Sequence, residues 1–138
     1  MKVFIDTNIL ISTALFPKSV PAKAFYKAVT APYDAVICDQ NVEEIKRIFN
    51  KKFPDKISVL NTFLALIMTS VSIVMVPDAP IPDEARIRDE KDRPIFRAAV
   101  CSGAEIFLTG DKDFLESRIT DPRVLSPSAF LDRKSDAT

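Results

Sequence analysis

The stretch FLTGDKDF, residues 107–114, places two aspartates and a lysine directly behind a short apolar run. That run belongs to the segment EIFLT at 105–109, whose length and apolar character are typical of a buried strand. The segment MKVFID at 1–6 repeats the arrangement, because its apolar residues lead directly to Asp6. Both segments therefore predict central strands that end at a carboxylate.

Strand-like and helix-like segments alternate along the chain, which predicts an α/β fold. The expected strands are at 1–6, 34–38, 72–76, 105–109 and 123–126. The expected helices are at 7–16, 20–31, 42–53, 55–70, 93–102 and 127–133. The predicted architecture is three-layer α/β/α and Rossmann-like, with a central parallel sheet of about five strands. The charged, proline-rich stretch at 77–94 is expected to be an irregular surface loop.

The length and composition indicate a folded, water-soluble protein. The chain has 138 residues, which fits a single domain at 1–138. Its 19 lysines and arginines balance 19 aspartates and glutamates, so net charge does not indicate a dedicated nucleic-acid or membrane binder. Cys38 and Cys101 lie in apolar stretches without CxxC spacing, and we expect both to be buried free thiols of a cytoplasmic protein. The uncharged segment 57–76 is expected to be a helix followed by a buried strand, because polar residues interrupt it and its second half is rich in β-branched residues.

Carboxylates from four separated segments are expected to meet at one edge of the sheet. The carboxyl ends of parallel strands and the amino ends of the helices that follow them share that edge. The acidic residues placed there are Asp6, Asp39, Glu43, Glu44, Asp92, Asp111 and Asp113. Facing carboxylates repel one another unless a cation lies between them, and oxygen ligands favour Mg²⁺ or Mn²⁺.

Most of these acids also have a structural alternative. Asp39, Asp92 and Asp113 fit the N-cap position of a helix, where aspartate is favoured. Glu43 and Glu44 fit ion pairs on the surface of their own helix. By contrast, the acids at positions 6 and 111 directly follow predicted central strands, where an unpaired carboxylate is costly.

The absence of histidine narrows the possible chemistry. Without histidine the chain cannot form a Ser-His-Asp triad, an imidazole general base or the usual zinc site. A metal ion held by carboxylates lowers the pKa of its bound water and supports in-line attack on a phosphodiester. The sequence therefore favours hydrolysis of a phosphate ester.

Four stretches together resemble the successive motifs of PIN domains, in particular the bacterial and archaeal toxins of toxin-antitoxin pairs. The stretches are MKVFIDTNILIS at 1–12, VEEI at 42–45, RDEKDRPIFRAAVCSGAEIFLTGDKDF at 88–114 and RVLSPSAFL at 123–131. The resemblance implies a PIN-like fold and an endoribonuclease that depends on Mg²⁺ or Mn²⁺, cleaves RNA and is neutralised by a small antitoxin. We also expect a homodimer without any membrane association.

The resemblance also implies roles for individual residues. The implied catalytic and metal-binding carboxylates are Asp6, Glu44, Asp92 and Asp111, with Asp113 as a further or alternative metal ligand. Glu44 is preferred to Glu43 because the family's glutamate directly precedes an apolar residue, as Glu44 precedes Ile45. Asp89 and Glu90 are rival acids close to Asp92. The implied supporting residues are Thr7, Asn8 and Thr109.

Basic residues near the acidic edge are candidates for contacts with substrate phosphates. They are Arg86, Arg88, Arg93, Arg97 and Lys112, with Lys18, Lys23 and Lys27 beside the first helices. We select Arg93 and Lys112 as the substrate-binding residues. Two alternatives to a nuclease stay open: a Mg²⁺-dependent phosphatase or receiver-like α/β domain, and a non-catalytic PIN-like scaffold that binds RNA or protein.

Overall fold

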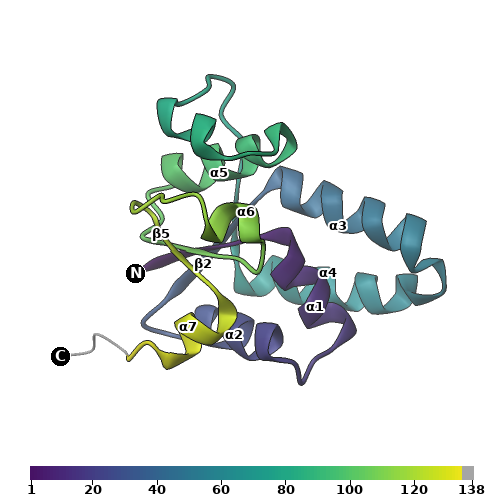
Figure 1. Ribbon diagram of the computed structural model, residues 1–138. Helices are drawn as coiled ribbons and strands as arrows, with labels where there is room; N and C mark the ends of the chain where they lie inside the picture. The colour runs from purple at the N-terminus through teal and green to yellow at the C-terminus, as the bar shows by residue number, and fades with distance from the viewer. Residues whose placement is uncertain (135–138) are drawn as a thin grey trace.

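Five parallel strands form the sheet at the centre of the protein. The structure is a computed structural model and describes residues 1–134. The strands are β1 (Lys2–Ile5), β2 (Asp34–Cys38), β3 (Ser72–Val74), β4 (Ile106–Leu108) and β5 (Arg123–Leu125). Their order is β3-β2-β1-β4-β5, and all four pairings are parallel. The expected sheet at the centre of the molecule is confirmed (Figure 1). The two strands that end at acids, β1 and β4, pair with each other.

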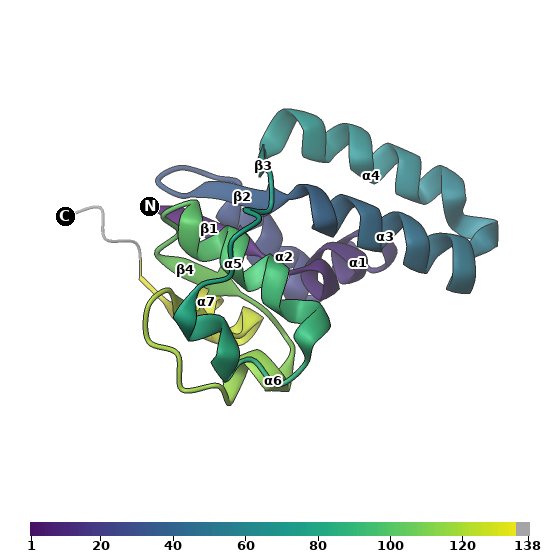
Figure 2. The same cartoon turned by 90° about the horizontal axis from the view of Figure 1, so that it is seen from above.

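Helices cover both faces of this sheet, as expected for three layers (Figure 2). The helices are α1 (Thr7–Leu15), α2 (Val20–Ala28), α3 (Asp39–Lys52), α4 (Ile57–Ser70), α5 (Arg93–Cys101), α6 (Lys112–Leu115) and α7 (Pro127–Asp132). One core cluster joins α1, α2, α3, α4 and α7 to one face of the sheet. The other cluster joins α5 and α6 to the opposite face. Alternate β1 residues divide between the clusters, with Val3 and Ile5 in the first and Phe4 in the second.

An aromatic stack supports the acidic end of β4. Phe107 packs on Phe4 of the neighbouring strand with ring centroids 5.6 Å apart, and on Phe114 of α6 at 4.6 Å. Phe96 of α5 contacts both Phe107 and Phe114, at 6.1 and 6.4 Å. All four rings are buried. The stack therefore fixes α5 and α6, each of which has an aspartate at its N-cap, against the sheet.

Two expectations about exposure were wrong. β3 was expected to be a buried strand at 72–76, but it ends at Val74 and its residues are exposed or half-buried, because it lies at the edge of the sheet with one neighbour. Cys101 is exposed rather than buried, because it lies outside the face of α5 that packs on the sheet, whereas Cys38 is buried as expected. Gly103 has φ +79, and this left-handed conformation after α5 is one that glycine adopts without strain.

The length and the apolar character of each helix decide whether it could cross a membrane. Within residues 1–134, no helix combines the length and the apolar character that crossing a bilayer requires. The uncharged segment forms α4 and then β3, as predicted.

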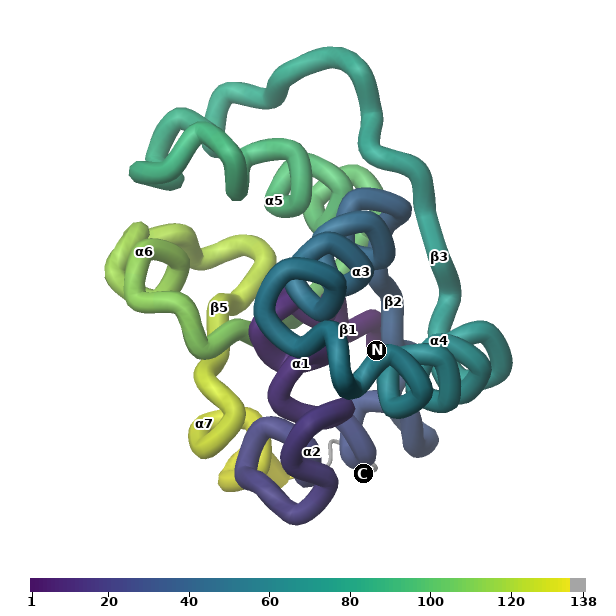
Figure 3. The backbone as a smooth tube through the Cα atoms, turned by 90° about the vertical axis from the view of Figure 1, so that its right-hand side faces the viewer, coloured from purple at the N-terminus to yellow at the C-terminus, as the bar shows by residue number. Residues whose placement is uncertain are grey.

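The stretch at 77–94 is more ordered than expected. After β3 the chain runs as a long arm from the edge of the sheet to α5 (Figure 3). It contains two short 3-10 helices, η2 (Pro82–Arg86) and η3 (Glu90–Asp92). Glu84 and Ile87 are buried. The stretch lies mostly at the surface, as expected, but it is not irregular. Glu84 and Ile87 anchor it to the core cluster that contains α5 and α6.

Lys27 is also placed differently from the phosphate contact considered above. Its ammonium group donates to the carbonyl oxygens of Phe130 and Arg133, both at 2.6 Å, and of Leu131 at 3.4 Å. These carbonyls belong to the last turn of α7 and the residue after it, where a cation is favoured by the helix dipole. Lys27 therefore fastens α7 to α2.

Replacing this lysine tests the anchor. Lys27→Met removes the donor of three hydrogen bonds to partly buried carbonyls, so we expect it to lower the free energy of unfolding by about 2 kcal/mol. The matched control is Lys23→Met on the same helix, where the lysine is exposed and little change is expected. Urea denaturation followed by circular dichroism measures both, and equal stabilities of the two variants would contradict the anchoring role.

Candidate functional site

Asp6 lies at the carboxyl end of β1 and is the N-cap of α1. Its Oδ1 accepts a hydrogen bond from the backbone N–H of Thr7 at 2.8 Å. Its Oδ2 accepts one from the Thr109 hydroxyl at 2.8 Å and one from the Asn8 side-chain amide at 3.2 Å. The residue is buried, so these donors replace the water that the carboxylate loses on folding.

Asn8 and Thr109 join the ends of β1 and β4. The Asn8 amide nitrogen donates to Thr109 Oγ1 at 3.4 Å, and its oxygen accepts from the Gly110 backbone N–H at 3.1 Å. Thr109 Oγ1 also accepts from the Asp111 backbone N–H at 3.0 Å. These bonds fix the direction in which the chain leaves β4 toward its acids. Asn8 and Thr109 thus lie where supporting residues were expected.

Thr7 joins the end of β1 to α3. Its hydroxyl donates to Glu44 Oε1 at 2.7 Å and accepts from the Asn41 amide at 2.9 Å. Asn41 in turn accepts from the Cys38 backbone N–H at 2.8 Å and is fully buried. Sequence reasoning missed Asn41. The available signal was a polar side chain one turn before Ile45, on the face of α3 that packs into the core.

The structure separates the two adjacent glutamates of α3. Glu43 is exposed, whereas the Glu44 side chain is only 17% exposed and faces Thr7. Glu44 also lies 3.9 Å from Arg47, the kind of surface pair that was considered as an alternative. Because this contact is long and Arg47 is largely exposed, the hydrogen bond from Thr7 is the better-defined interaction.

The carboxylates of Asp92, Asp111 and Asp113 form the tightest acidic group among the described residues. Each offers a ligand oxygen, and these oxygens lie within 4.8 Å of one another. Such spacing suits carboxylates that share one hard cation. Asp6 and Glu44 lie outside this group of three. Glu44 is close enough for its charge to act on both Asp92 and Asp6, and Asp92 is close enough for its charge to act on Asp6.

The helix-capping alternatives can now be compared with the structure. Asp92 occupies the N-cap position of α5, yet within residues 1–134 its side chain accepts no capping hydrogen bond. The cap of α6 is Asp111, which accepts from the Asp113 backbone N–H at 2.9 Å, so the capping role considered for Asp113 was wrong. Asp39 is not the cap of α3 either, because Cys38 holds that position and Asp39 accepts from the Val76 N–H at 3.0 Å. The carboxylates of Asp92 and Asp113 are therefore free of a capping role.

Burial and mutual repulsion change the acidity of two site carboxylates. Burial raises the pKa of Asp6 to about 7, despite the opposing hydrogen bonds from Thr109 and Thr7, and the charges of Asp92 and Glu44 add to the rise. Burial also raises the pKa of Asp92 to about 6, with the charges of Asp111, Asp89, Glu44 and Asp113 adding to it. Both shifts mean that negative charge is poorly compensated at this edge. A bound cation is the compensation that fits this donor set.

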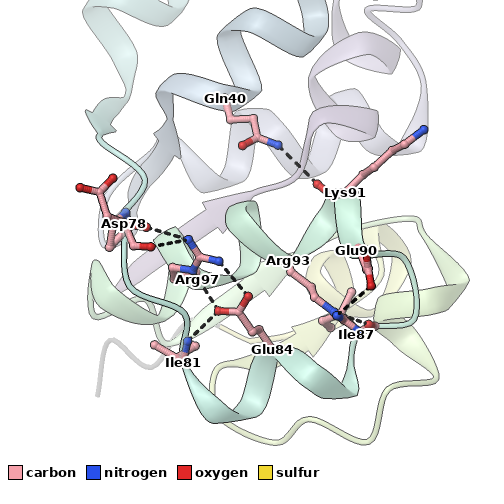
Figure 4. A network of polar contacts seen from close by, with 10 residues as sticks. Gln40, Asp78, Ile81, Glu84, Ile87, Glu90, Lys91, Arg93 and Arg97 are labelled. Carbon is pink, nitrogen blue, oxygen red and sulfur yellow. Dashed lines mark hydrogen bonds and ion pairs between the residues drawn. The ribbon is translucent and has the colours of Figure 1, made fainter.

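The remaining predicted residues lie around the edge of the site. Asp89 and Glu90, the rival acids, are exposed, and Asp89 accepts from the Lys91 N–H at 3.0 Å. Arg93 donates to the Ile87 carbonyl at 3.0 Å and lies 3.8 Å from Glu90, as Figure 4 shows. Lys112 is exposed at the start of α6.

The fold and the site together define a class of proteins, namely three-layer α/β domains that gather carboxylates at the carboxyl edge of a parallel sheet. Within that class the family is shown by sequence. A model of the PIN domain family matches residues 2–113. The chain therefore belongs to the PIN domain family. No match is found among curated protein sequences.

Solved structures show the same fold at low sequence identity. The crystal structure of VapBC2 from Rickettsia felis, bound to a DNA fragment from their promoter, matches with a TM-score of 0.70 and 14% identity, covering 91% of this chain and 98% of that one. VapC20 of Mycobacterium tuberculosis, described as a sarcin-ricin loop cleaving toxin, matches with a TM-score of 0.61 and 13% identity, covering 86% and 96%. A Pyrobaculum aerophilum protein matches with a TM-score of 0.54 and 15% identity, covering 95% and 96%.

The raised pKa of Asp6 predicts how stability depends on pH in the absence of metal. The pKa is 3.8 for the ordinary group and about 7 in the folded protein, so the folded state binds this proton more tightly. The resulting stabilisation is complete below the ordinary pKa of 3.8 and is lost as pH rises through the folded-state pKa of about 7. The free energy of unfolding changes by about 4 kcal/mol between these limits. We expect wild-type protein in EDTA to lose stability over this range, and Asp6→Asn, which stays neutral, to lose less.

Thermal or urea unfolding from about pH 4 to pH 8 measures the difference between the two proteins. Asparagine is also a good N-cap, so the start of α1 is preserved in the variant. Asp55→Asn, at an exposed position, serves as the control. Parallel pH profiles for wild type and Asp6→Asn would show that the buried carboxylate does not carry this dependence.

Proposed function

We propose that the protein is a metal-dependent endoribonuclease and the toxin of a toxin-antitoxin pair, acting in the cytoplasm as one domain. The observation that carries the proposal is the group of Asp92, Asp111 and Asp113, with oxygens within 4.8 Å of one another beside the buried Asp6. Membership of the PIN domain family and the description of the mycobacterial neighbour as an RNA-loop cleaving toxin support it. The absence of histidine removes the main alternatives for phosphodiester hydrolysis.

The residues present fit a hard divalent cation, for which we propose Mg²⁺ or Mn²⁺. All candidate ligands are carboxylate oxygens, and the raised pKa values of Asp6 and Asp92 indicate a site that favours added positive charge. We propose Asp6, Asp92, Asp111 and Asp113 as ligands, with Glu44 completing the catalytic set. When bound, the ion supplies an activated water and neutralises charge on the phosphate.

The surrounding residues would act by holding these carboxylates in place. Thr109 and Asn8 fix the direction of the Asp6 carboxyl group through their hydrogen bonds, and the bond from Thr109 opposes the rise in its pKa. Thr7 orients Glu44 toward the end of β1. For substrate binding, Lys112 is better placed than Arg93, because Lys112 is exposed whereas Arg93 is engaged with the Ile87 carbonyl. These hydrogen bonds limit the motion of Asp6 and Glu44 before substrate arrives.

Adjacent glutamates provide a matched test of this function. Purified protein incubated with single-stranded and structured RNA should cleave in Mn²⁺ or Mg²⁺ and not in EDTA. Glu44→Gln removes a charge from the site and should lower kcat at least about 100-fold, a typical loss for one preorganised electrostatic group. Glu43→Gln changes an exposed neighbour on the same helix and should leave kcat unchanged.

A loss of Mn²⁺-induced thermal stabilisation in Asp92→Asn would support the metal site independently of activity. Wild-type protein that binds RNA but cuts none in either metal would instead favour the non-catalytic scaffold. Cleavage that persists in EDTA would exclude the proposed mechanism.

We further propose that the antitoxin binds an apolar groove of about 520 Å³ between α1, α2 and α4. Ala14, Tyr26, Phe63 and Leu66 contribute to its walls, and Tyr26 and Leu66 are 42% and 43% exposed. The toxin-antitoxin complex among the structural neighbours supports a protein partner. Exposed apolar side chains gathered in one groove are typical of a binding surface. The expected homodimer stays a prediction, which sedimentation velocity at high protein concentration tests.

A charged substitution in the groove tests the partner surface. Leu66→Glu should reduce co-purification of a co-expressed antitoxin at least about tenfold, because it buries an unpaired charge. Lys46→Glu, on the exposed face of α3, controls for the change in charge. Equal co-purification with both variants would place the partner elsewhere.

A further inference from the structure

The arm at 77–92 is fixed to the protein at both of its ends. At its start, the Val76 backbone N–H donates to Asp39 at the beginning of α3 at 3.0 Å. At its end, the Gln40 side chain, also from α3, donates to the Lys91 carbonyl at 3.4 Å (Figure 4). The arm therefore spans from the edge strand to Asp92, which opens α5, without being free to swing away.

An ion pair between Glu84 and Arg97 holds the middle of the arm. The guanidinium donates to both carboxylate oxygens of Glu84, each at 2.9 Å, and to the Pro77 carbonyl at 2.8 Å. Glu84 also accepts from the Ile81 backbone N–H at 2.7 Å. The two side chains are only 9% and 12% exposed. Such a paired, planar contact specifies one geometry, and here it ties three points of the arm to α5 (Figure 4).

The Glu84–Arg97 pair, which we call the clamp, holds a part of the arm where the backbone is fixed on both sides of Arg88. Ile87 is fully buried, donates its N–H to the Glu84 carbonyl at 3.0 Å and accepts from Arg93 at 3.0 Å. On the other side, the Asp89 carboxylate accepts from the Lys91 N–H, and its carbonyl accepts from the Asp92 N–H, both at 3.0 Å. Arg88 is thus presented from a rigid backbone.

The Arg88 side chain itself is largely unconstrained and reaches the acidic group. It is 77% exposed, and its Nη1 lies 3.4 Å from Asp113 Oδ1. An exposed ion pair of this kind contributes little to stability and exchanges readily. Its planar guanidinium matches the geometry of a phosphate, which offers a second partner at the same place.

We propose that Arg88 binds a phosphate of the RNA substrate, and that the Glu84–Arg97 pair is a positioning element that holds the arm so that Arg88 lies over the Asp113 side of the site. The proposal rests on the proposed ribonuclease function. Neutralisation of the acids by a bound cation frees Arg88 from Asp113 for the substrate. Arg88 then favours an RNA chain that carries a phosphate next to the scissile phosphate. Glu84 and Arg97 hold Arg88 in position and do not contact the RNA.

The test compares Arg88→Gln with Arg86→Gln on full-length protein. Arg86 is an exposed arginine of the same arm, and among the described residues no ion pair joins it to a site acid. Arg88→Gln should raise KM for a single-stranded RNA oligonucleotide in Mn²⁺ about tenfold, with kcat within about twofold. The Kd of the Arg88→Gln variant for the same RNA, measured with Ca²⁺ in place of Mn²⁺, should rise by a similar factor. Arg86→Gln should leave both quantities unchanged.

Two readouts separate a phosphate contact from a structural role. Losing one phosphate contact should reduce the slope of log Kd against log salt concentration by about 0.7 for single-stranded RNA. The affinity for Mn²⁺ alone, from calorimetry, should be equal or higher in Arg88→Gln, because a competing cation is removed from Asp113. A weaker Mn²⁺ affinity with unchanged RNA affinity would overturn the proposal and make Arg88 a support of the metal site.

If the clamp acts by positioning Arg88, breaking the clamp should affect KM only when Arg88 is present. Glu84→Gln should raise KM several-fold, and the double variant with Arg88→Gln should be no worse than Arg88→Gln alone, because both changes remove one contact. Arg97→Lys, which keeps the charge but not the paired geometry, provides a second variant should Glu84→Gln fold poorly. If the fold-changes in KM of the two single variants multiply in the double variant, the positioning role is overturned.

The failure of this inference can be distinguished from failure of the function. Wild-type cleavage of RNA with equal KM for Arg88→Gln and Arg86→Gln would overturn the inference and leave the nuclease intact. If the wild-type protein neither binds nor cleaves RNA, both the inference and the proposed function are overturned.

Discussion

The buried carboxylate of Asp6 is the constraint on which the rest of the site depends. A charge placed at the end of the central strand has to be compensated, and Thr7, Asn8 and Thr109 supply hydrogen bonds from two segments. The same residues hold the ends of β1 and β4 together and connect onward to α3. Satisfying this single carboxylate therefore determines where the neighbouring acids lie. The remaining excess of negative charge is what a metal ion would compensate.

The acids stand on a rigid apolar base rather than on flexible loops. Phe107 lies in β4 two residues before Thr109, and Phe114 follows Asp113 directly. Their ring centroids are 4.6 Å apart, so this contact closes the short connection that carries Asp111. Phe96 fixes α5, which begins beside Asp92, against the same rings. Aromatic packing beneath the site thus limits the freedom of carboxylates that repel one another.

The sequence predicts the parts of this protein that depend on local pattern. Strands that end in acid place Asp6 and Asp111 at one edge. The preference for Glu44 over Glu43 came from the resemblance to PIN domains, and in the structure Glu44 faces Thr7. Contacts between distant segments were not predictable in this way. Asn41 and the Glu84–Arg97 pair look like ordinary polar residues until the fold brings their partners near, and the anchored arm was therefore taken for a loop. Lys27 was misjudged for the same reason, because its partners lie 103 to 106 residues away.

The separation between Asp6 and its partners also has a consequence for synthesis. The Thr109 hydroxyl that binds Asp6 follows it by 103 residues, and β4, which carries Thr109, must insert beside β1 before the two can meet. A chain emerging from the ribosome therefore exposes its first acid long before the rest of the cluster exists. Contacts of such long range form late in folding. The acidic edge is consequently assembled only when most of the described chain has been made, so a nascent or prematurely ended polypeptide lacks it.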